Sequence, residues 1–141
     1  MKKRTLFILL VIASCSVWSQ SNTYSDSCSI KKNGVYYASL DKETNIYLRF
    51  YENDTAVTTS SMNNVKKAAT YIAKELGDKL MRGKYFINPS SCNIRVKAKN
   101  DFGKVKMDGI ISGDKLVMAV INLDDRTASD FVFNFYPIAK P

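Results

Sequence analysis

The chain has 141 residues, which is enough for one domain and too few for two. It contains no histidine, which excludes Ser-His-Asp and Cys-His nucleophile systems and the usual histidine-containing zinc sites. Neither a glycine-rich phosphate loop nor the acidic spacing of a calcium loop occurs in it. We therefore expect a protein that is not an enzyme and that carries neither a metal ion nor a cofactor.

The first residues have the pattern of an export signal. Three basic residues follow Met1, and an apolar run over 6–13 comes next, far shorter than the ~20 residues that a transmembrane helix needs. Two cleavage sites are open. Ordinary cleavage would remove 1–19 and leave a chain that begins at Gln20. Alternatively, Ile12-Ala13-Ser14-Cys15 resembles a lipobox, in which 1–14 is removed and Cys15 is acylated.

Either cleavage places the mature protein outside the cytoplasm, as a periplasmic or secreted protein or one that is lipid-anchored to the envelope. We expect membrane attachment only through a lipid on Cys15. Loss of 1–19 leaves 18 basic and 13 acidic residues, a net charge of +5 instead of +8. This charge fits solubility, or attraction to an anionic envelope surface or an acidic partner. The basic residues are scattered, which argues against nucleic acid.

Cys28 and Cys92 remain once Cys15 is removed or lipidated. A pair of cysteines in an oxidising compartment predicts a disulfide. This bond would tie an irregular polar tether, 20–32, to the loop after the fourth strand. The rest of the chain, 33–141, is expected to form one domain.

Strands dominate the first part of this domain. Ile46, Leu48 and Phe50 alternate with Tyr47, Arg49 and Tyr51, the pattern of a strand with two different faces. The first three strands are expected at 35–40, 45–51 and 56–61.

One helix is expected next, over 63–76. Its apolar residues recur at helical spacing, and Lys66, Lys67 and Lys74 fall on the other side. Ser61, Asn63 or Asn64 can cap its start, and Gly77 can supply a left-handed end. The expected apolar stripe is Val65, Ala68, Ala69, Ile72 and Leu76.

Five more strands follow the helix. The fourth, fifth and eighth are expected at 85–88, 94–99 and 131–136. The sixth and seventh form a hairpin over 104–123, with Gly113-Asp114 as a two-residue type II′ turn. This turn sets a register that puts an apolar set of side chains on one face, whereas a slip by one residue would bury lysines. The expected pairs are Ser112 with Lys115, Ile111 with Leu116, Gly109 with Met118, Met107 with Val120, and Val105 with Asn122.

The predicted fold is mainly β: an eight-stranded antiparallel meander with one helix after the third strand. Such a sheet tends to close, because free edges template aggregation. The eighth strand would then pair with the first, and the helix would cover one mouth or one flank of the barrel.

This layout resembles the calycin group of small β-barrels, the lipocalin-like proteins, and in particular those exported to bacterial envelopes. Gly34-Val35-Tyr36 is similar to the Gly-x-Trp opening of the first lipocalin strand, with Tyr in place of Trp. Lipocalins carry their helix after the eighth strand, whereas this helix follows the third. The resemblance implies a barrel that encloses an apolar ligand, and it does not imply catalysis.

The leading hypothesis is a non-enzymatic envelope protein that binds a small apolar or amphipathic ligand inside the barrel. The apolar part would lie among Met107, Met118, Val120 and the phenylalanines, Phe133 included. Tyr47, Arg49 and Tyr51 would hold the polar end, since a guanidinium between two phenols can bind a carboxylate or phosphate. The alternative is that these three residues only cover the outside of the barrel.

A second hypothesis is a protein-binding module, such as an inhibitor, an immunity-type protein or an assembly factor. It would contact an acidic partner from the envelope through a basic stripe on the fifth strand, Arg95, Lys97 and Lys99. The alternative for this stripe is an ordinary solvated strand face.

Overall fold

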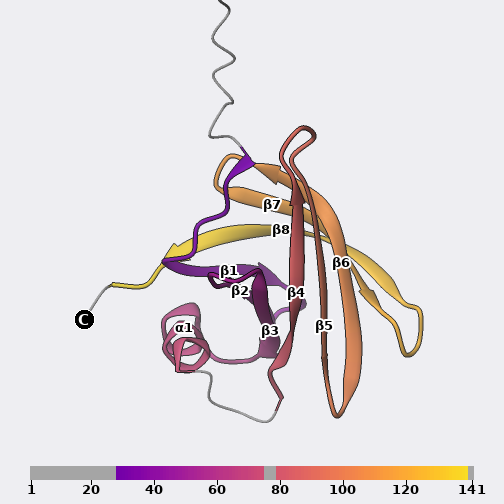
Figure 1. The fold of residues 1–141 in the computed structure, drawn as a ribbon. Coiled ribbons are helices and arrows are strands. Elements are labelled where there is room, and N and C mark those ends of the chain that lie inside the picture. The colour runs from indigo at the N-terminus through magenta and orange to yellow at the C-terminus, as the bar shows by residue number, and fades with distance from the viewer. Residues whose placement is uncertain (1–27, 75–78, 140–141) are drawn as a thin grey trace, which may run out of the picture.

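The computed structural model describes residues 28–74 and 79–139, and these form one closed antiparallel barrel (Figure 1). The strands are β1 (Gly34–Ser39), β2 (Asn45–Phe50), β3 (Thr55–Ser61), β4 (Met81–Asn88), β5 (Asn93–Asn100), β6 (Gly103–Ser112), β7 (Lys115–Asn122) and β8 (Ala128–Pro137). The helix α1 (Val65–Ala73) lies between β3 and β4.

Each strand pairs with its neighbours in the sequence, and β8 pairs with β1 to close the barrel, as predicted. The hairpin of β6 and β7 has the predicted register, from Ser112 opposite Lys115 to Val105 opposite Asn122. Gly113 has a φ of 62°, the left-handed value that a type II′ turn requires at its first central position. The apolar face of this hairpin points into the barrel, where Met107, Ile111 and Met118 are buried.

The helix covers one flank of the barrel rather than a mouth (Figure 1). Ala68, Ala69 and Ile72 are buried against the outer faces of the first strands, where they pack with Val35 and Val57. The barrel therefore has two apolar clusters, one inside it and one between its wall and the helix. No helix in residues 28–74 and 79–139 is long and apolar enough to cross a membrane.

The helix is shorter than predicted. Asn64 caps it, with its side-chain oxygen accepting a hydrogen bond from the Lys67 N–H at 3.0 Å, and the helix begins at Val65. Lys74 is the residue at its end, and the predicted Leu76 and Gly77 lie outside the described residues.

Two strands begin at least three residues earlier than predicted. β4 begins at Met81 and not at Tyr85, so Gly83 lies within the strand. A Cβ at Gly83 would collide with the Lys97 carbonyl on β5, so this close approach needs glycine. β8 begins at Ala128, where a polar segment pairs with the end of β7. Pairing with an existing neighbour extends both strands beyond their apolar residues.

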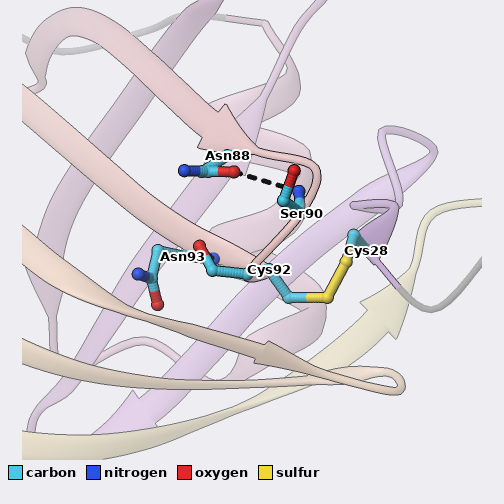
Figure 2. Close-up of a disulfide and its surroundings, with 6 residues drawn as sticks. Cys28, Asn88, Ser90, Cys92 and Asn93 are labelled. Atoms are coloured by element: carbon cyan, nitrogen blue, oxygen red, sulfur yellow. Dashed lines mark hydrogen bonds between the residues drawn. A yellow bond between two sulfur atoms is a disulfide. The ribbon is translucent and has the colours of Figure 1, made fainter.

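The disulfide joins Cys28 to Cys92 in the loop between β4 and β5, as predicted, with the two Cα atoms 4.8 Å apart (Figure 2). In the same loop, the side-chain oxygen of Asn88 accepts a hydrogen bond from the Ser90 N–H at 2.9 Å. The segment after Cys28 is thereby held against one end of the barrel, and Ile30 packs against the inner core.

Loss of this bond should destabilise the barrel. The two cysteines are 64 residues apart, and a loop of this length corresponds to about 4 kcal/mol in the chain-entropy model. We expect the double variant Cys28→Ala with Cys92→Ala to lose about this much free energy of unfolding in urea titrations. The wild type under reducing conditions should unfold at the same urea concentration as the variant. A loss below about 1 kcal/mol would show that the bond constrains little.

Candidate functional site

A cavity of about 600 Å³ opens at the end of the barrel away from the disulfide. We call this the open end. It is where β1, β3, β5 and β7 finish and where β2, β4, β6 and β8 begin. Its deeper wall is mostly apolar and includes Ile46, Met81, Val105, Met107, Val120 and Phe131, together with the buried Thr58, whose hydroxyl donates to the Tyr47 carbonyl. Its rim is mainly polar, with Lys79, Asn100, Lys104, Asn122, Thr127 and Ser129, and it also contains the exposed Leu40 and Phe102.

Side-chain to backbone hydrogen bonds hold the rim in place. The Asn100 side-chain oxygen accepts from the N–H groups of Phe102 and Gly103, at 2.8 and 2.9 Å, and so fixes the turn between β5 and β6. One Asp124 carboxylate oxygen accepts from the Lys104 N–H at 2.9 Å, which joins the loop after β7 to β6. A Cβ at Gly103 would lie 2.8 Å from that same oxygen. The protein's own hydrogen bonds therefore hold the rim in this shape.

The opposite end of the barrel is filled by aromatic side chains. Tyr36 packs edge-on against Phe50 and lies against Phe135, with ring centroids 5.7 and 5.1 Å apart. Phe50 in turn packs against Tyr85 at 4.9 Å. The Lys31 N–H donates to the Tyr36 hydroxyl at 2.9 Å, and burial raises the pKa of that phenol despite this bond. The cavity therefore has one entrance on the described chain, at the open end.

The predicted residues of the barrel interior lie inside it, at different depths. Met107 lines the cavity. Met118 and Phe133 are fully buried in the inner core and do not line the cavity. These two side chains help to fill the closed half of the barrel.

The other predicted set lies on the outer face of β2, beneath the helix. The Tyr47 hydroxyl donates to the Asn63 carbonyl at 2.6 Å, and the Tyr51 hydroxyl donates to the Ile72 carbonyl at 3.1 Å. The Arg49 guanidinium lies over the Tyr51 ring, 4.9 Å from its centroid. Because β2 separates this set from the interior, the structure does not bring Arg49 together with Met107.

The residues of the rim were not singled out from the sequence. Lys79, Met81 and Phe102 fall in segments that read as connectors or turns, with no alternation to assign them a face. Val120 and the phenylalanines of the last strand are among the residues that the sequence places around the apolar part of a ligand, and Val120 and Phe131 line the cavity. Only the ring of loops at the open end shows that these side chains share one cavity.

No family model, curated protein or solved structure matches this chain in the comparisons with known proteins. In the described part of the chain, no cysteine, aspartate and glutamate side chains form a group of three that could hold a metal ion. The fold and the cavity are thus the observations on which a function can be based.

Arg49 gives a test of the outer set. Its Nε and Nη1 atoms are buried and make no hydrogen bond. A buried donor without a partner lowers the free energy of unfolding by about 1–3 kcal/mol. We expect Arg49→Met to raise the free energy of unfolding by about 1 kcal/mol in urea titrations, since Met keeps the packing against Tyr51. Arg95→Met is the control, because Arg95 donates to Asp108 at 2.7 Å, and it should bring no gain. A loss in Arg49→Met above about 1 kcal/mol would show that the guanidinium stabilises the fold, and would contradict a net cost of its unpaired donors.

Proposed function

We propose that the protein is a non-enzymatic binding protein of the cell envelope, which holds a small amphipathic ligand in the cavity at the open end. The apolar part of the ligand would lie against Met81, Met107 and Phe131, and its polar end would stay at the rim. The observation that carries this proposal is a cavity with an apolar wall, a polar rim and a filled opposite end. Ligand sites of small molecules commonly have this composition.

The size and charge of the cavity narrow the class of ligand. A volume of about 600 Å³ suits a molecule with an acyl chain or a few rings. Lys79 and Lys104 line the rim, with the Lys104 side chain on the outer face of β6 beside the entrance, while Asp124 already accepts a hydrogen bond from the Lys104 backbone. An anionic head group therefore fits the rim better than a cationic one.

The absence of enzymatic activity and the export to the envelope are part of the proposal. Lys79, Lys104 and Asp124 are the ionisable side chains that line this cavity in the described chain, and all three are exposed. A catalytic acid or base usually sits in a more buried position, with a partner that tunes it. The disulfide agrees with an oxidising compartment. A lipocalin-like barrel that carries an apolar ligand would fit these features.

The first experiment is a mass measurement on protein purified from its native envelope without refolding. Intact mass under native and denaturing conditions should differ by the mass of a co-purified ligand. Equal masses would contradict a tightly bound ligand. The denatured mass also distinguishes a chain that begins at Gln20 from one acylated on Cys15.

A substitution at the mouth should block the cavity without changing the core. Ser129 is exposed, lines the cavity and shares the inward face of β8 with Phe131 and Phe133. We expect Ser129→Trp to weaken binding of a fluorescent amphipathic anion, anilinonaphthalene sulfonate, at least about tenfold, because the indole occupies the entrance. Asp130→Trp adds the same side chain to the outer face of β8 and should bind as the wild type does. Equal binding by both variants would place the ligand elsewhere.

A further inference from the structure

The outer faces of β4, β5 and β6 carry a regular array of basic side chains. The strand register aligns these residues in two rows across the three strands, since each lies directly opposite its neighbour. We call this surface the basic face; one row is Arg82, Lys99 and Lys104, and the other is Lys84, Lys97 and Lys106. The residues between them, such as Val96 and Ala98, point into the barrel.

These two rows of like charge lower the stability of the folded protein. Each row places like charges in directly opposed cross-strand positions, which repel one another. Asp108 compensates part of this charge at one edge of the face, with its carboxylate 2.6 Å from the Lys106 ammonium and 2.7 Å from Arg95 Nε. Burial raises the pKa of Asp108, but hydrogen bonds from Lys106 and Arg95 outweigh this effect and leave the pKa below its ordinary value. Lys97, Lys99 and Lys104 have no such carboxylate at their cross-strand positions.

Two exposed aromatic side chains flank the basic face along the strands. Phe102, in the turn between β5 and β6, is 74% exposed, and Phe86 on β4 is 67% exposed. Phe86 lies opposite Arg95, in the row next to Lys84 and Lys97. Large exposed aromatics cost free energy in water. Beside lysines, they are the combination by which proteins hold to the interface of an anionic bilayer.

The composition of the face distinguishes a membrane from a protein partner. Protein interfaces are depleted in lysine and rely on buried aromatic and arginine anchors. Here five of the six basic residues are lysines, which are flexible point charges suited to many dispersed anions. We propose that the basic face docks on an anionic phospholipid surface, with Phe86 and Phe102 entering the head-group region.

Docking on this face would also place the cavity entrance at a defined position relative to the bilayer. Phe102 and Lys104 both line the cavity rim, so the entrance lies at the edge of the basic face. A bilayer against this face would sit next to the mouth, where an amphipathic ligand could enter from the membrane. The membrane contact itself does not depend on the proposed ligand, because its residues other than Phe102 and Lys104 do not line the cavity.

Charge reversal tests the electrostatic part. With the chain that begins at Gln20 and carries no lipid, we expect flotation with phosphatidylglycerol-containing vesicles at low salt and little with pure phosphatidylcholine. Lys97→Glu with Lys99→Glu should weaken vesicle binding at least about 25-fold, since each basic residue near an anionic surface contributes roughly fivefold. This variant should melt at the wild-type temperature or above it, because it relieves repulsion between like charges.

The matched control is Lys66→Glu with Lys67→Glu, which makes the same change of net charge on exposed residues of α1. Its binding should stay within about threefold of the wild type, because charges far from the contact are screened. Equal weakening by both pairs would show a response to net charge alone and would overturn the proposal. Wild-type binding to both kinds of vesicle alike would overturn it as well.

Phe86→Ser with Phe102→Ser tests the aromatic part. We expect this variant to lose most vesicle binding and to keep its binding to soluble polyphosphate. A wild-type protein that binds polyphosphate but does not float with anionic vesicles would identify a linear polyanion and overturn the membrane proposal. Vesicle binding by a protein whose mass shows no co-purified ligand would support docking while it contradicts the ligand-binding function.

Discussion

Closure of the sheet between β8 and β1 is the constraint on which the other features depend. Once the sheet is closed, every strand has one inward and one outward face, and the alternation of side chains separates two environments. Inside, Tyr36, Phe50 and Met118 fill one end of the barrel. On the outside, each part of the barrel wall is either covered by another element or exposed to water. The site and the surface that we propose are consequences of this division.

The two ends of the barrel differ because, in residues 28–74 and 79–139, the chain closes only one of them. The disulfide brings the segment after Cys28 to one end, where Ile30 packs against the inner core. There the Lys31 Nζ lies 3.9 Å from the Oδ2 of Asp114, a residue of the turn between β6 and β7. At the other end, short turns held by Asn100 and Asp124 form a rim and leave the interior accessible. The cavity and the packed aromatic side chains thus lie at opposite ends of one barrel.

The outer wall shows a similar division. The helix covers β1, β2 and β3, whose outward residues Val35, Tyr47 and Val57 are apolar or aromatic and buried. Within the part of the chain that the structure describes, no element covers the wall of β4, β5 and β6, which presents cations between two exposed phenylalanines. In a closed barrel the backbone of every strand is already paired with its neighbours, so no strand edge needs to be covered. The side chains of this outer wall can therefore serve for contact with a partner.

Local patterns determined much of the fold. The Gly113-Asp114 turn and the apolar face around Met107 were sufficient for the register of β6 and β7, because a slip would have buried lysines. Export context and cysteine number were sufficient for the disulfide. Tertiary structure alone decided that Met81 belongs to β4, that Arg49 lies over Tyr51 on the outside of the barrel, and that residues from separate loops line one cavity. The alternation of side chains specifies which face of a strand is apolar. The pairing of strands decides which residues meet at the barrel mouth and which charges lie opposite one another, and this pairing joins segments that are far apart in the chain.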